Sequence, residues 1–151
     1  MPKIELESVE QTNRTGYPPP HDCQVAGRWS QKLGAQFGLT DFGATVTTLE
    51  PDAWSSQRHW HEGEDELVVM LEGEAVLVED SGETVMRPGD VAIFPKGAAN
   101  GHHFINRSAV PCRLIAVGKA GVSAPVHYSD IDMMIDPAEG PGYRHKDGTP
   151  Y

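Results

Sequence analysis

The sequence predicts an all-β fold in a single domain, a barrel or sandwich of short antiparallel strands. The chain has 151 residues, a length that suits one domain with its own core. From about residue 34, short stretches rich in Val, Thr, Leu and Ile alternate with Gly, Pro, Asp and Ser, as in all-β domains. No segment of helical length shows the period of an amphipathic helix.

Eight strands are expected in the body of the chain. Their Val, Thr and Ile residues favour extended backbone. Turn residues separate them, for example Pro51-Asp52 and Glu72-Gly73, which fix φ or tolerate positive φ. The expected strands span 44–50, 55–61, 66–72, 74–79, 83–86, 90–95, 101–106 and 112–118.

The two ends of the chain differ in composition from this body. Residues 1–33 include Tyr17-Pro18-Pro19-Pro20 and show little periodicity, so an extended N-terminal arm is expected. Residues 34–135 form the barrel. Residues 136–151 are rich in Gly and Pro and are expected to form an irregular C-terminal tail that packs on the barrel.

The segment 67–71, Leu-Val-Val-Met-Leu, is apolar at every position. A strand of this kind is covered on both faces. One face belongs to the barrel interior. The other can be covered by a second copy of the chain, which predicts a homodimer, or by the arm or the tail.

Charge and composition exclude several classes of partner. The formal net charge is -10 and the pI is near 5.0, so a nucleic-acid partner is not expected. No apolar run reaches the roughly 20 residues of a membrane span, and the first residues lack the apolar core of a secretory signal. We therefore expect a cytoplasmic protein. Cys23 and Cys112 are expected to be free, buried thiols.

Candidate metal-binding and substrate-binding residues are clustered in the segment around residue 60. His59 and His61 are two apart on an expected strand, so both imidazoles lie on one face. Gln57 shares that parity and is a candidate substrate-binding residue. The acidic turn 62–65 follows and lets the chain double back, which would bring Glu66 close to the two histidines.

Two imidazoles and a carboxylate need a further ligand from elsewhere in the chain. His102 and His103 are the candidates, and parity cannot choose between them because Phe104 and Ile105 are both apolar. Three imidazoles with one carboxylate suit a divalent transition metal such as zinc, iron, manganese, nickel or copper. Calcium and magnesium prefer sites made of oxygen ligands.

At these residues the sequence resembles the cupin superfamily, in particular a group of small bacterial single-domain cupins. The first cupin motif is matched without a gap by His59, His61, Glu66 and Gly73. In the second motif Gly89, Pro95 and Gly97 match, but Asn100 stands where histidine is expected. A loop longer by two residues restores the register, because Asn106 follows His102 at the motif spacing. The closing segment 143–151 is also similar to that group.

The resemblance implies a jelly-roll barrel with one divalent metal ion per chain at its mouth, and commonly a homodimer. The spacing between His102 and Asn106 favours His102 as the fourth ligand, and His103 is the alternative. A metal with open positions can bind a small metabolite that is sugar-like or carries a carboxylate. Isomerase, lyase and dioxygenase activities are open to such a site, and the alternative is a non-catalytic small-molecule-binding or sensor protein.

Overall fold

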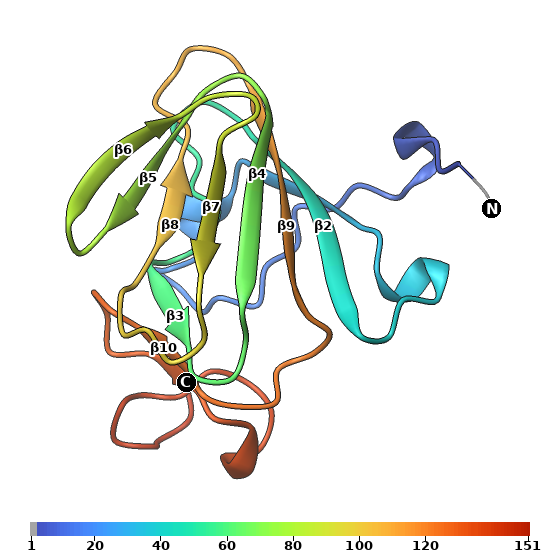
Figure 1. Ribbon diagram of the computed structural model, residues 1–151. Coiled ribbons are helices and arrows are strands. Elements are labelled where there is room, and N and C mark those ends of the chain that lie inside the picture. The colour runs from blue at the N-terminus through green and yellow to red at the C-terminus, as the bar shows by residue number, and fades with distance from the viewer. Residues whose placement is uncertain (1–2) are drawn as a thin grey trace.

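The computed structural model describes residues 3–151, and its regular secondary structure consists almost entirely of short antiparallel strands (Figure 1). Within this range the strands are β1 (Arg28–Lys32), β2 (Phe42–Leu49), β3 (His59–His61), β4 (Glu66–Glu72), β5 (Ala75–Glu79), β6 (Gly82–Met86), β7 (Val91–Phe94), β8 (His103–Ile105), β9 (Cys112–Lys119), β10 (Val126–Tyr128) and β11 (Met134–Ile135). The helical turns are η1 (Leu6–Ser8), η2 (Cys23–Val25), η3 (Ala35–Phe37) and η4 (Pro137–Glu139).

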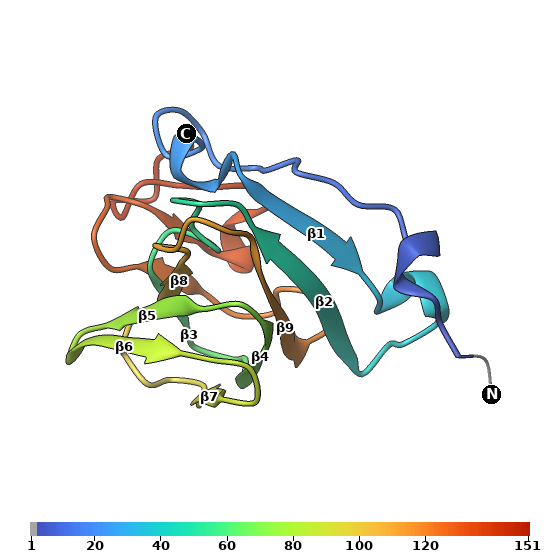
Figure 2. The same ribbon diagram turned by 90° about the horizontal axis from the view of Figure 1, so that it is seen from above.

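Three antiparallel sheets form the jelly-roll barrel. The largest has the strand order β1-β2-β9-β4-β7, and the other two have the orders β6-β5-β8 and β11-β10-β3. Figure 2, which looks down on the molecule, shows β1, β2 and β9 side by side, with the β5–β6 hairpin on another side of the barrel. The predicted all-β class is confirmed.

Alternation along the strands places the core inside the barrel. Val68 and Met70 on β4 are almost fully buried, and so are Leu114 on β9 and Phe104 on β8. Burial of side chains of this size typically contributes about 1.5–3 kcal/mol each. The turn between β4 and β5 needs Gly73, which has φ 71°, because a Cβ there would lie 2.8 Å from the Cβ of Cys112.

Both ends of the chain lie against the barrel. The expected arm includes β1, which pairs with β2 along its whole length, and Thr12 forms a bridge to Ser30. From the tail, Tyr143 packs on Tyr17 and Tyr128. The tail therefore packs against the N-terminal segment and β10.

The two cysteines differ in exposure. Both cysteines are free, but only Cys112 is buried, whereas Cys23 is exposed in η2. The expectation of a second buried thiol was wrong, because the N-terminal segment lies on the surface there. No helix among the residues described is long and apolar enough to cross a membrane.

Candidate metal centre

β3 carries His59 and His61 on its inward face. β3 pairs with β10, so that His61 lies opposite Val126 and His59 opposite Tyr128, and both partners are buried. Trp60 points the other way and stacks on His127 at 4.4 Å between ring centroids. The two inward rings are 4.8 Å apart between centroids, as period-two alternation requires.

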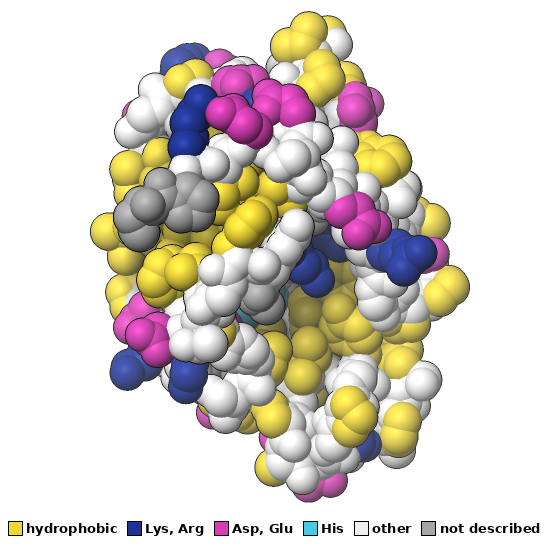
Figure 3. Space-filling view, turned by 90° about the vertical axis from the view of Figure 1, so that its right-hand side faces the viewer, with side chains coloured by type: hydrophobic (Ala, Val, Ile, Leu, Met, Phe, Trp, Pro, Cys, Tyr) yellow, Lys and Arg dark blue, Asp and Glu magenta, His cyan; other side chains and the backbone are white. Residues whose placement is uncertain are grey.

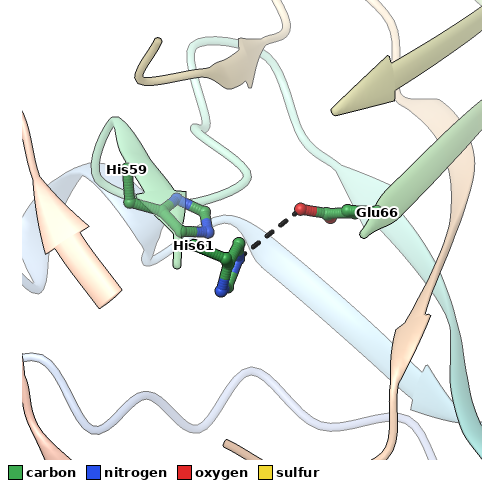
Figure 4. A group of neighbouring side chains, drawn as sticks. All are labelled: His59, His61 and Glu66. Atoms are coloured by element: carbon green, nitrogen blue, oxygen red, sulfur yellow. Dashed lines mark ion pairs between the residues drawn. The ribbon is translucent and has the colours of Figure 1, made fainter. Parts of the chain in front are cut away.

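The turn after β3 returns the chain so that Glu66, the first residue of β4, faces the two histidines (Figure 4). Candidate ligand atoms of His59, His61 and Glu66 all lie within 4.8 Å of one another. Nε2 of His61 is 3.7 Å from Oε2 of Glu66. These three residues form the compact group of the site.

His102 contacts this group through Glu66. Its Nε2 lies 3.0 Å from Oε2 of Glu66, and its backbone forms a two-way bridge with His59. The ring stacks on Phe94 at 3.5 Å with an interplanar angle of 4°. His103 is directed elsewhere, because its Nδ1 donates to the carbonyl of Ser56 at 3.0 Å. Of the two candidates, His102 is therefore the one beside Glu66.

The surroundings of His59 orient it as a ligand. Its Nδ1 lies 3.0 Å from the carbonyl oxygen of Gln57. Since a carbonyl only accepts, Nδ1 carries the proton and Nε2 has a free lone pair. Tyr128 stacks on the same ring at 5.7 Å. A backbone carbonyl on the distal nitrogen is the usual support of a metal-bound histidine.

Two buried nitrogens of the site have no hydrogen-bond partner, although Oε2 of Glu64 lies 3.3 Å from one of them, Nδ1 of His61. Among the described residues, Nδ1 of His61 and Nδ1 of His102 form no hydrogen bond. A buried polar atom left in this way typically costs about 1–3 kcal/mol and calls for an explanation such as a bound water or ion. Nitrogen and oxygen donors of this kind suit a divalent transition metal, and the unpaired buried nitrogens agree with a bound ion at this place.

The protonation states also suit ligation. Burial lowers the pKa of His59 from 6.5 to about 3 and lowers the pKa of His61 as well. Burial alone would raise the pKa of Glu66, but its hydrogen bond with His102 and the nearby imidazoles outweigh this effect and lower it. Neutral imidazoles and an ionised carboxylate are the forms that bind a metal.

These shifts predict how the metal-free protein responds to acid. In the unfolded chain a histidine takes up a proton near pH 6.5, whereas folded His59 resists protonation down to about pH 3. The contribution of His59 to stability is therefore complete above pH 6.5 and is lost as the pH falls from 6.5 toward 3. We expect the melting temperature of the metal-free protein to fall across this window and the His59→Gln variant to show a flatter profile. Identical profiles for the two proteins would contradict the prediction.

Glu64 is a further candidate residue, although from the sequence alone it is only part of an acidic turn. Its Oε2 lies 3.3 Å from Nδ1 of His61, and its Oε1 occupies the space over Gly118, 2.3 Å from where a Cβ would stand. Burial, followed by the nearby charge of Glu66, raises the pKa of Glu64 to about 7. A carboxyl group of this kind can take up or release a proton near neutral pH.

Gln57 does not have the position expected for a substrate-binding residue beside the histidines. Residues 55–58 precede β3 in a bend, where strand alternation does not apply. The Gln57 side chain is buried against the N-terminal segment, where its Nε2 donates to the carbonyl of His21 at 2.9 Å and to Oε1 of Gln24 at 3.2 Å. Its role in the structure is to fix that segment.

The space immediately beside the histidines is small. A cavity of about 50 Å³ is lined by His61, Glu64, Glu79, Asn100 and His102, among other residues. This volume suits an ion or a water molecule and is far below the roughly 300–1,000 Å³ of metabolite pockets. Asn100, found where the second motif has histidine, lies at the wall and donates to Oε1 of Glu79 at 2.9 Å.

Comparisons with known proteins agree with this fold. The family model described as Cupin domain matches residues 45–118. A Silicibacter pomeroyi protein, described as a sugar phosphate isomerase from the cupin superfamily, is 42% identical over 99% of this chain and 96% of its own, with a TM-score of 0.91. No curated protein matches the chain.

Two more distant structures share the fold. A candidate sugar phosphate isomerase from Acidithiobacillus ferrooxidans is 24% identical, with a TM-score of 0.67 over 80% of this chain and 84% of its own. The polyketide cyclase RemF from Streptomyces resistomycificus is 22% identical, with a TM-score of 0.71 over 92% of this chain and 91% of its own. At these identities the likeness concerns the barrel alone.

Proposed function

Because this chain belongs to the cupin superfamily, we propose that it is a metal-dependent enzyme acting on a small sugar-like or carboxylate-bearing metabolite. One divalent transition metal per chain is held by His59, His61, Glu66 and His102. The observation that carries the proposal is the approach of ligand atoms from the first three residues to within 4.8 Å of one another, with His102 bonded to Glu66.

The residues around the site supply orientation and exclude water. A bound divalent ion with an open position polarises a carbonyl group or lowers the pKa of a coordinated water. The carbonyl of Gln57 and the ring of Tyr128 fix His59, and Phe94 covers the face of His102. This packing excludes water from one side of the site and strengthens its electrostatic interactions.

Isomerisation is the reaction class that we favour. The relative that is 42% identical over nearly the whole chain is described as a sugar phosphate isomerase, and sugar isomerisation needs a polarised carbonyl and a proton transfer. Both are within the chemistry of a metal with nitrogen and oxygen ligands. Zinc, iron, manganese and nickel all suit the donor set.

The proposal is tested by metal analysis followed by activity assays. The protein is purified without added metal, its metal content is measured, and it is reloaded with zinc, iron, manganese or nickel in turn. We expect about one ion per chain and isomerase turnover of an aldose or ketose phosphate with at least one metal. Bound metal without turnover, with metabolites that still raise the melting temperature, would favour a non-catalytic binding or sensor protein instead.

We also propose that the protein is a homodimer, formed through the outer face of the large sheet. Cross-strand register places Leu67 beside Ile93 and Val117, and Val69 beside Val91 and Ile115. Val91 is 52% and Ile93 is 65% exposed. A continuous apolar patch of this kind favours association over exposure to water.

The dimer is tested by light scattering coupled to size-exclusion chromatography. The native protein is expected to have twice the mass of the chain, and Ile93→Asp is expected to be a monomer because a charge is then buried in the interface. Val85→Asp, which changes an exposed residue of β6, is the matched control and should stay dimeric. A monomeric native protein or a dimeric Ile93→Asp variant would contradict this proposal.

A further inference from the structure

A groove of the described structure lies apart from the candidate metal ligands. It has a volume of about 890 Å³ and is bordered by residues of the segment 10–17, by β1 and β2, and by Tyr143. Figure 3, which faces this side of the molecule, shows a hollow with basic side chains beside apolar surface. The volume lies within the range of sites for small metabolites.

Sheet register relates this groove to the site. Gly43, at its edge, is the cross-strand partner of Gly118, and Gly118 is the partner of Glu66. Cross-strand partners face the same side of a sheet, and two strand spacings amount to about 10 Å. The groove therefore opens on the inner face of the large sheet. The carboxylate of Glu64 lies over Gly118, between the edge of the groove and Glu66.

The charged side chains that line the groove are mainly basic, although the protein as a whole is acidic. Its described lining includes Arg14, Arg28 and Lys32 but one acidic side chain, Glu10, although the chain carries 22 acidic and 12 basic residues. Arg28 and Lys32 are four residues apart on β1, so their side chains lie on the same face of the sheet. Their cross-strand partners on β2 are Leu49 and Thr45. Long side chains at these positions can converge on one anion between them.

These three cations are also without a carboxylate partner among the described residues. Elsewhere, four arginines form ion pairs: Arg58, Arg87, Arg107 and Arg113. In the groove, Arg28 donates to the carbonyl of Ser55 at 2.8 Å. Arg14 and Lys32 form no side-chain hydrogen bond or ion pair with the described residues. Unpaired cations gathered in a concave site of an acidic protein favour an anionic ligand.

An aromatic wall connects the groove to the metal centre. Tyr143 and Tyr17, both lining the groove, lie 5.2 Å apart between ring centroids. Tyr17 packs edge-on against Tyr128 at 5.7 Å, and Tyr128 stacks on His59. A ligand in the groove would therefore lie against the same cluster of tyrosines that orients a candidate metal ligand.

From these observations we propose that the groove binds the phosphate group of a small phosphorylated metabolite, through Arg28 and Lys32 with Arg14 at the rim. This inference rests on the proposed function, since the rest of the same metabolite would extend toward the metal. A phosphate suits the site better than a carboxylate, because three cations match a doubly charged group and because it offers more acceptor oxygens.

The test is calorimetric titration of the 151-residue chain with glycerol 3-phosphate, inorganic phosphate and acetate at low ionic strength. We expect both phosphates to bind and acetate to bind at least about ten-fold more weakly. Lys32→Gln and Arg14→Gln should each weaken phosphate binding about ten-fold, since each removes a charged contact. Neither side chain supports the fold through a hydrogen bond, so both variants are expected to fold.

Arg107→Gln is the matched control, because it removes one positive charge outside the groove and should leave phosphate binding unchanged. The titration is repeated after chelator treatment, and phosphate binding that persists supports the groove even if the metal proposal fails. No phosphate binding, binding insensitive to Lys32→Gln and Arg14→Gln, binding lost with the metal, or equal binding of acetate would overturn the inference.

Discussion

Replacing His61 with alanine is expected to remove most of the bound metal. His61 is one of three residues whose ligand atoms lie within 4.8 Å of one another. Loss of a residue that merely supports a ligand typically lowers metal affinity about 10–100-fold, so loss of a ligand should exceed that range. The measurement is metal content per chain after dialysis, with circular dichroism to show that the variant is folded.

Two other histidines serve as controls for this experiment. His127 lies on the outer side of β10, stacked on Trp60 and 2.7 Å from Oε1 of Glu62, so His127→Ala should keep its metal. His103→Ala should also keep it, because the His103 ring is directed to Ser56 and Trp54. Full metal content in His61→Ala would contradict the ligand set, and loss in His103→Ala with retention in His102→Ala would reverse the choice of the fourth ligand.

Replacing Asn106 with alanine is expected to cause a large loss of stability. The Asn106 side chain is fully buried. Its Nδ2 donates to the carbonyls of Leu49 and Val110, both at 2.8 Å, and its Oδ1 accepts from the backbone and hydroxyl of Ser108. Each lost hydrogen bond is costly because it leaves the former partner of Asn106 without a hydrogen bond in the protein interior. We expect about 3 kcal/mol less stability and a melting temperature lower by roughly 10 °C.

The matched control for Asn106 is Ser108→Ala. It removes the hydroxyl partner of Asn106 but leaves the bonds to Leu49 and Val110 in place, so its cost should be about 1 kcal/mol. Metal content should be unchanged in both variants below their melting temperatures. Equal melting temperatures for Asn106→Ala and the native protein would show that these four bonds do not anchor the turn after β8.

The strands that sequence predicted best are those with strong local signals. β4 and β9 contain runs of Val, Leu and Ile between turn residues, and their bounds agree closely with expectation. β1, with the sequence Arg-Trp-Ser-Gln-Lys, was not expected, and neither were the short strands β10 and β11. Their extended form depends on pairing with β2 and β3, which local propensity does not report.

The candidate site was predictable where strand parity applies. His59 and His61 share a face because they lie inside β3, whereas Gln57 lies outside it, where parity misled. The choice between His102 and His103 depends on the bridge from His102 to His59. Glu64 could not be found in this way, because its place depends on the space over Gly118, a residue more than fifty positions away in the chain.

The most direct test of the metal centre is anomalous X-ray diffraction from crystals of the metal-loaded protein, recorded at the absorption edge of the bound ion. We predict one peak per chain, about 2.0–2.2 Å from a nitrogen of His59, His61 and His102 and from an oxygen of Glu66. A peak coordinated by other residues, or no peak in a crystal of protein with full metal content, would contradict the proposed site.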